Sequence, residues 1–412
     1  MPHLISFLII CVGLLTGSLG HYVPNPLLHL GILVVMAYLF SRTADFLGLP
    51  AFLGYILAGM IAGHDGFGFV HEKFLDNMSL IEGLCVMIIV SHIVRFMLKG
   101  TLLPRFFKFF ALGIISSLAS MLLTIVFLVP VSIPLQVKII GGLFASTFSP
   151  LLCHFFTEHE ESPKPYPAIA FGGFICSLVL WGIMIPFWDT ALPHRLKLAL
   201  MPIIIGITSI SVGFAWGFLS EKLFYRKSGI LKDLFPLAVM FLIYPCCGEI
   251  GLDYLFVAIG VGVYYGIISE QTETMYKNSE LVSLIVFGLF GTRLSLTGAV
   301  LLDITNWIFV TLLILCIVLT RIITVKLTMK LLGSESVNSI STIYLIPYGP
   351  LAVIIIMRFL PGFSNVLEGD YNRYTVSSIM TTSCILSLIF GIFFNLFTKI
   401  MNRKPVMEID NS

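Results

Sequence analysis

The chain has 412 residues, of which 58% are hydrophobic and only 11% are charged, and its mean hydropathy is +1.00. Soluble proteins carry about 25% charged residues, so this composition excludes a soluble globular protein and indicates that most of the surface faces lipid. The formal net charge of +2 gives no reason to expect a nucleic-acid partner. None of the eight cysteines lies in a CxxC or Cys/His spacing, so we expect no metal site and no cofactor.

A helix needs about 20 mostly apolar residues to cross a bilayer. Applied along the chain, this criterion predicts fourteen spans, of which the first and the third are short. The predicted spans are residues 4–19, 27–47, 52–68, 79–97, 109–130, 137–157, 167–187, 198–219, 233–250, 254–269, 281–301, 306–332, 340–360 and 375–399. We therefore expect an all-α polytopic membrane protein with 13–14 transmembrane helices.

The first predicted span allows two interpretations. Residues 4–19 are short enough for the core of a signal peptide, and the small residues of GSLG at 17–20 resemble a cleavage site. No Lys or Arg precedes the segment, although signal peptides begin with basic residues, so we favour a retained extra helix. We expect an N-terminal helix or signal-like segment over 1–26, a transmembrane domain over 27–399 and a short cytoplasmic tail over 400–412.

Basic residues surround the connections after the fourth, eighth and fourteenth predicted spans. They are Arg95, Lys99, Arg105, Lys108, Lys222, Arg226, Lys227, Lys232, Lys399, Arg403 and Lys404. Cytoplasmic loops carry an excess of Lys and Arg, so this distribution places the C-terminus in the cytoplasm. With fourteen spans the N-terminus is cytoplasmic too. We expect an integral protein of a bacterial inner (plasma) membrane.

Four segments carry a family resemblance. Residues 49–63 (LPAFLGYILAGMIAG) resemble the N-terminal signature of the monovalent cation/proton antiporter superfamily, which includes the sodium/hydrogen exchangers. Residues 248–252 (GEIGL), 287–291 (FGLFG) and 344–353 (YLIPYGPLAV) resemble later segments in the family's order. The resemblance covers nearly all of 27–399. It implies antiport of sodium or potassium against protons, no enzymatic activity, inverted repeats with two broken crossing helices, and a homodimer in membrane lipid.

Two predicted spans contain helix-breaking residues. Ser149 and Pro150 follow Thr147 about 13 residues into the sixth span, roughly 20 Å along a helix, and Gly349 and Pro350 lie about 10 residues into the thirteenth, roughly 15 Å along it. Proline removes a backbone donor, and irregular backbone at membrane depth survives only where it is buried in protein or lines a cavity. We expect both spans to be unwound and to cross near the midplane. The alternative is two ordinary proline kinks.

The carboxylates that the resemblance leads one to expect are missing. The family places one or two ion-binding aspartates in the helix after the first broken one, where this chain has Leu180 and Trp181. One branch also has an aspartate where Ser149 stands. No Asp or Glu occurs between residues 138 and 157 or between 167 and 188. Thr147, Ser149 and Ser177 offer hydroxyl or carbonyl oxygens to a cation, but these groups cannot exchange it for a proton near neutral pH.

Arg321 is a further candidate, because an arginine inside a span is a functional-site hypothesis by default. It lies about 15 residues into the twelfth span, some 22 Å along the helix, where the resemblance implies a basic residue that pairs with an acidic one. Without that acid the cavity would be net positive. The alternative is that Arg321 extends toward the cytoplasm beside Lys326, as long side chains near helix ends do.

Two other residues are candidate proton carriers. Glu249 is a carboxylate near the outer end of the ninth span, although an interfacial position explains it equally simply. His154 has a side chain that titrates near pH 6.5, although a lone histidine in a helix is more often only hydrogen-bonded. The candidate ion or substrate residues are Thr147, Ser149, Pro150, Ser177, Trp181, Arg321, Gly349 and Pro350, with Glu249 and His154 as possible proton carriers.

Three hypotheses of function remain open. The first is an ion transporter with an atypical site, coupled through Glu249, His154 or backbone groups. The second is a transport-inactive relative that acts as a sensor or scaffold. The third is a carrier of an anion or a neutral solute that uses Arg321 as its fixed charge.

Overall fold

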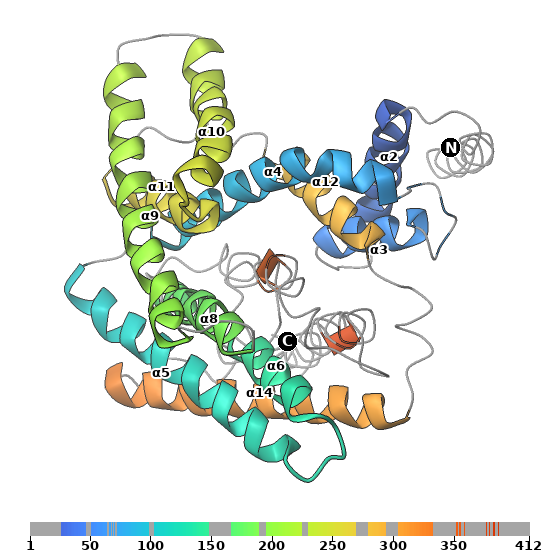
Figure 1. Cartoon of the computed structure of the whole chain (residues 1–412), viewed down its shortest axis with the longest axis vertical. Helices are drawn as coiled ribbons and strands as arrows, with labels where there is room; N and C mark the ends of the chain where they lie inside the picture. The colour runs from blue at the N-terminus through green and yellow to red at the C-terminus, as the bar shows by residue number, and fades with distance from the viewer. Residues whose placement is uncertain are drawn as a thin grey trace, which may run out of the picture.

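The computed structural model describes residues 26–46, 51–63, 66, 68, 70, 72–98, 103–147, 166–188, 195–224, 230–268, 279–293 and 304–332, and nine single positions between 352 and 386. These ranges contain eleven α-helices and no strand (Figure 1). The helices are α2 (Pro26–Phe46), α3 (Ala51–Ala62), α4 (Glu72–Leu98), α5 (Leu103–Leu128), α6 (Leu135–Ser146), α8 (Tyr166–Trp188), α9 (Arg195–Phe224), α10 (Ile230–Ile250), α11 (Tyr254–Ile267), α12 (Ser279–Thr292) and α14 (Ile304–Leu332).

Each of the eleven helices overlaps a predicted span, which confirms the expected all-α membrane fold. Four of them carry apolar stretches long enough to cross a bilayer, at Met78–Leu98, Phe106–Leu128, Leu200–Lys222 and Asn306–Thr324. Shorter apolar stretches of 10–17 residues lie in α3, α6, α8, α10, α11 and α12. The predicted spans at 4–19, 340–360 and 375–399 fall outside the described residues, apart from the single positions.

The helices pack in two groups. In the first, α4 packs on α11, α11 on α9, and α12 on both α3 and α4. In the second, α5 contacts α6, α8 and α14. This second group lies along the lower edge of Figure 1, and α8 joins it to α9 of the first.

Glycines permit the close crossing of α3 and α12. A Cβ atom on Gly59 would lie 2.1 Å from the carbonyl oxygen of Gly288, and one on Gly291 would lie 2.2 Å from that of Ile56. Any larger residue would force the helices apart. Small residues hold membrane helices together because they let backbones approach closely. The family-like segments at 49–63 and 287–291 are therefore packed against each other.

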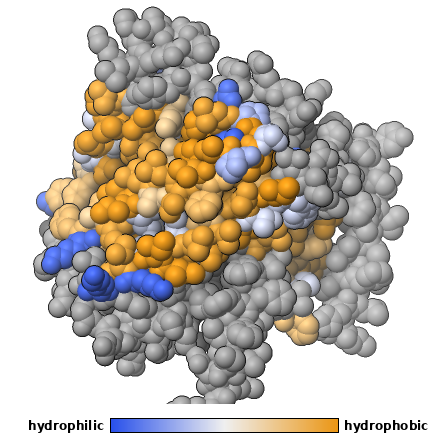
Figure 2. Space-filling view, turned by 90° about the horizontal axis from the view of Figure 1, so that it is seen from below, coloured by the Kyte–Doolittle hydropathy of each residue, from blue (hydrophilic) through white to orange (hydrophobic). Residues whose placement is uncertain are grey.

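The outer face of α5 and α14 is apolar. Ile115 and Leu122 on α5 are 60% and 61% exposed, and Ile323 on α14 is 50% exposed. Figure 2 views the molecule from the side on which these two helices lie in Figure 1, and it shows a broad apolar surface. Such a surface is stable in contact with acyl chains rather than water, in keeping with a membrane protein.

Candidate ion-transport site

Helix α6 ends inside the sixth predicted span. Its last residue is Ser146, and Thr147 has the extended dihedral angles φ −71° and ψ 127°. The helix therefore stops three residues before Ser149, within the segment that was expected to break the span. Ser149, Pro150 and His154 lie outside the described residues, as do Gly349 and Pro350 of the second expected break.

Hydroxyl groups satisfy several carbonyls at the end of α6. Ser146 Oγ donates to Leu143 O at 2.6 Å, and Thr147 Oγ1 donates to Phe144 O at 2.6 Å. Ser117 on α5 donates its Oγ proton to Ser146 O at 2.8 Å. The last carbonyls of a helix have no intrahelical partner and are costly to bury unpaired, so these hydroxyls make a buried helix end possible.

Arg321 donates hydrogen bonds to two further carbonyls at the end of α6. Its Nη2 lies 2.7 Å from Thr147 O and 3.3 Å from Ala145 O. The residue is only 1% exposed and sits in the middle of α14, so it does not extend toward the helix end beside Lys326. The C-terminal end of a helix carries partial negative charge. Arg321 therefore contacts the backbone at the end of α6, whose partial negative charge offsets part of its positive charge.

Hydroxyl pairs fix α14 against α5 beside this contact. Ser116 Oγ and Thr324 Oγ1 form one pair, and Ser120 Oγ lies 2.9 Å from Thr320 Oγ1. All four side chains are buried. Because Thr320 and Thr324 flank Arg321 on α14, these pairs hold the guanidinium in position at the end of α6.

Trp181 and Ser177 occupy one side of α8. Both are 0% exposed, and Trp181 packs in the same apolar cluster as Phe174 and Leu178. The indole thus fills volume where the family resemblance places an ion-binding aspartate. Ser177 Oγ has no hydrogen-bond partner among the described residues, so it is a candidate hydroxyl for contact with a ligand.

The four helices of this group contain no acidic residue. Neither Asp nor Glu occurs in α5, α6, α8 or α14. Their described residues can therefore offer oxygen atoms to a cation but no titratable carboxylate. The carbonyl oxygens of residues 143–147, at the end of α6, already accept hydrogen bonds from Arg321 or from Ser and Thr hydroxyls.

The sodium/hydrogen exchanger transmembrane family model matches residues 30–399. The chain belongs to the sodium/hydrogen exchanger family. Members are integral membrane proteins, and the family's substrates are a monovalent cation and the proton.

The fold has a solved counterpart. The chain is similar to the structure described as the sodium proton antiporter MjNhaP1 from Methanocaldococcus jannaschii at pH 8, with a TM-score of 0.67 and 16% sequence identity. The match covers 91% of this chain and 98% of that one. At this identity the likeness establishes the antiporter fold. No curated protein matches the chain in sequence.

The exchanger does contain a buried carboxylate, but in the other group of helices. Glu82 on α4 is 8% exposed, and it is the one acidic residue among the buried side chains that the structure describes. Arg293, directly after α12, donates from Nη2 to Glu82 Oε2 at 2.7 Å. Sequence reasoning did not single out this pair. The signal was present, because each residue is a charge inside a predicted span, at 79–97 and at 281–301.

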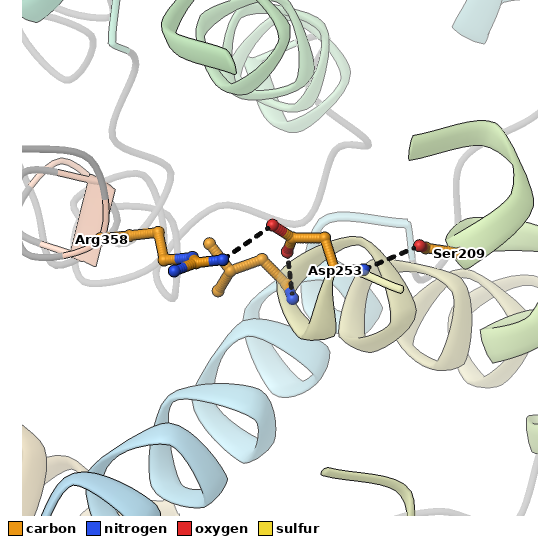
Figure 3. A network of polar contacts seen from close by, with 4 residues as sticks. Ser209, Asp253 and Arg358 are labelled. Carbon is orange, nitrogen blue, oxygen red and sulfur yellow. Dashed lines mark hydrogen bonds and ion pairs between the residues drawn. The ribbon is translucent and has the colours of Figure 1, made fainter. Parts of the chain in front are cut away.

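A second ion pair connects α11 of the exchanger with residue 358 (Figure 3). Arg358 Nη2 lies 3.4 Å from Asp253 Oδ2, and its guanidinium lies 5.2 Å from the centre of the Tyr254 ring. Asp253 also caps α11, because its Oδ1 accepts a hydrogen bond from Leu255 N at 2.8 Å. Its own backbone N–H donates to Ser209 Oγ on α9 at 3.1 Å. Asp253 thus joins three segments, and the sequence analysis missed it.

The remaining candidate, Glu249, lies apart from both places. It is exposed on the last turn of α10. This position agrees with the interfacial interpretation and gives the side chain no contact with the end of α6.

Proposed function

We propose that the protein is a membrane ion transporter of the sodium/hydrogen exchanger family in which conventional sodium- or potassium-for-proton exchange is weak or absent. The observation that carries this proposal is the contact of Arg321 with Thr147 O and Ala145 O. A fixed guanidinium occupies carbonyl oxygens that a mobile cation would otherwise coordinate at the broken helix.

The missing carboxylate supports the same conclusion. Exchange at one site requires a group that binds either the cation or a proton, and α5, α6, α8 and α14 contain no Asp or Glu. Stripping water from a cation without a charged partner costs several kcal/mol or more. The buried indole of Trp181 adds a steric obstacle. Ser177 and the hydroxyls around α6 cannot replace a titratable acid.

The main alternative is a transport-inactive sensor or scaffold with the antiporter fold. The fully buried Trp181 and the saturated end of α6 favour it, because both make the site rigid and filled. A carrier of an anion or neutral solute through Arg321 has less support, since the guanidinium already donates to two carbonyls.

We further propose that the fold consists of inverted repeats. Helix α4 packs on α11 while α12 packs on α3, so exchanging α3 with α11 and α4 with α12 maps one contact onto the other. This reciprocity is what two related halves produce. The proposal includes a homodimer in a bacterial inner membrane. It also includes a cytoplasmic C-terminus, which the positions of Lys and Arg favour.

The test is a flux assay in proteoliposomes. An imposed pH gradient should drive little or no sodium, potassium or lithium movement through the unmodified protein. Trp181→Asp should introduce cation-dependent proton flux, because the carboxylate gives both a cation ligand and a counter-charge for Arg321. Trp181→Ser is the matched control, since it opens the same volume without an acid.

Each outcome has a definite meaning. Robust cation-driven proton movement by the unmodified protein, unchanged by Glu249→Gln and His154→Ala, would contradict the proposal. If Glu249→Gln alone abolished such flux, the protein would be a transporter whose titratable acid lies on α10. Anion-driven flux that Arg321→Gln abolishes would support the carrier alternative, and inactivity of Trp181→Asp would favour the scaffold.

A further inference from the structure

Helices α5 and α14 run antiparallel along a shared face. Ser116 on α5 pairs with Thr324 on α14, and Ser120 pairs with Thr320. The first turns of α5 therefore lie level with the last turns of α14. Lys108 precedes Ser116 by two helical turns, roughly 12 Å. It therefore lies level with the last turn of α14.

Three lysines gather at this end of the helix pair. Lys108 is exposed on α5, and Lys326 and Lys330 are exposed on α14. Residues four apart lie on the same side of a helix, so Lys326 and Lys330 are neighbours. In Figure 2, strongly hydrophilic side chains border one edge of the apolar surface.

These lysines have no acidic neighbour on their own helices. Neither α5 nor α14 contains Asp or Glu, and no ion pair joins any of the three lysines to another residue that the structure describes. Like charges at such spacing destabilise a protein unless an anion compensates them. We therefore expect a negatively charged partner to bind this lysine cluster.

An apolar band extends from the lysines along both helices. Leu122 and Val126 on α5 are 61% and 62% exposed, and Leu319 and Ile323 on α14 are 40% and 50% exposed. An acyl chain lying along this band would be shielded from water while its headgroup stayed at the lysine end. The surface thus combines the two chemistries of a phospholipid.

We propose that the α5/α14 face binds an anionic phospholipid, with its phosphate at Lys108, Lys326 and Lys330 and its acyl chains on the apolar band. Basic clusters at the cytoplasmic ends of membrane helices bind anionic headgroups, and the positions of Lys and Arg predict that this end is cytoplasmic. A second copy of the chain is a poorer occupant, because a symmetric contact would bring two sets of the three lysines together.

The test counts lipids on the purified protein by native mass spectrometry. The probes are phosphatidylglycerol, zwitterionic phosphatidylcholine with the same acyl chains, and inorganic phosphate. We expect the unmodified protein to retain phosphatidylglycerol in preference to phosphatidylcholine. Lys108→Gln combined with Lys326→Gln and Lys330→Gln should weaken phosphatidylglycerol binding by roughly 10- to 100-fold.

A matched control removes the same charge elsewhere. Lys222→Gln combined with Lys227→Gln and Lys232→Gln takes three lysines from α9 and the residues after it. Because these lysines are not on α5 or α14, the change should weaken phosphatidylglycerol binding less than the change at Lys108, Lys326 and Lys330. Replacing Lys108, Lys326 and Lys330 with arginine keeps the charge and should preserve binding, which separates loss of the site from loss of folding.

Four results would overturn the proposal. The first is equal retention of the two lipids by the unmodified protein, and the second is an equal loss in the control variant. The third is complete displacement of phosphatidylglycerol by inorganic phosphate. The fourth is that the lysine changes alter only the oligomeric state. The assay measures no transport, so its outcome is independent of the flux experiment.

Discussion

Two regions of the molecule neutralise buried or partly buried arginines in different ways. At the end of α6, Arg321 donates hydrogen bonds to the backbone carbonyls of Ala145 and Thr147. In the α4/α11/α12 group, Arg293 is satisfied by the carboxylate of Glu82, and Arg358 by that of Asp253. A backbone carbonyl is not an acid–base group, whereas a carboxylate is one. The arginine at the end of α6 thus contacts neutral oxygen atoms, whereas the two arginines of the other group contact anionic ones.

The two regions are held together by different kinds of contact. The Arg321 contact depends on the end of α6, because only a helix end presents carbonyl oxygens in this way. The two ion pairs depend on side chains. Substitutions should therefore have unequal effects in the two regions.

The largest effect is expected from Arg321→Leu. The change leaves Ala145 O and Thr147 O without their donor in an apolar environment, and an unsatisfied buried carbonyl costs about 1–3 kcal/mol. Relief from burying a charge offsets part of this, so we expect a loss of about 2–4 kcal/mol in unfolding free energy. Thermal unfolding in detergent measures it. Arg321→Lys should recover part of the loss, and unchanged unfolding of Arg321→Leu would disprove the capping role.

A smaller effect is expected from Glu82→Gln. The pair with Arg293 is mostly buried on the Glu82 side and one-third exposed on the other, so water compensates part of the change. We expect a loss of about 1–2 kcal/mol. In a double-mutant cycle with Arg293→Gln, the double variant should be no less stable than the worse single variant. Additive losses would show that the two residues act independently.

The pair of Asp253 with Arg358 should contribute less again. The oxygen–nitrogen distance is 3.4 Å and the arginine side chain is 42% exposed, and exposed pairs contribute about 0–1 kcal/mol. Asp253→Asn keeps an acceptor for Leu255 N and should cost less than about 1 kcal/mol. Asp253→Ala also removes the cap of α11 and should cost about 1 kcal/mol more. Equal stability of the two variants would show that the cap is unimportant.

The smallest effect is expected from Glu249→Gln. The side chain is exposed on α10, and exposed substitutions of this kind change stability by about 0.5 kcal/mol or less. Neither thermal unfolding nor any residual ion flux should change. A clear loss of flux would connect α10 with the transport site and weaken the contrast between the two regions.

Much of the fold could be predicted because apolar run length is a direct signal. Eleven predicted spans contain a helix, yet some ends differ. Helix α6 ends at Ser146 and α12 at Thr292, before the expected ends of their spans, and residues 148–165 and 294–303 lie outside the described part of the chain. The hydropathy criterion does not detect these ends, because the residues that follow them are also apolar. Where a helix ends depends instead on nearby Ser, Thr, Gly and Pro residues.

The site was only partly predictable. Sequence reasoning identified Arg321, Trp181 and the missing aspartates, which are side-chain signals. It could not find the contacts of Arg321 with Ala145 O and Thr147 O, because a carbonyl oxygen is present in every residue and leaves no signature in the sequence. Glu82 and Arg293 were overlooked because they lie 211 positions apart, and only the packing of α4 with α12 brings them together.

The contact between α14 and α6 has a consequence for biogenesis. Arg321 follows Thr147 by 174 positions, and a ribosome adds about 5–20 residues per second. Roughly 9–35 s therefore pass between the synthesis of the end of α6 and the synthesis of Arg321. Until then Ala145 O and Thr147 O must find water or translocon groups. The first half of the chain is thus completed by a residue from the second, and a nascent chain that stops before α14 should remain sensitive to membrane quality control.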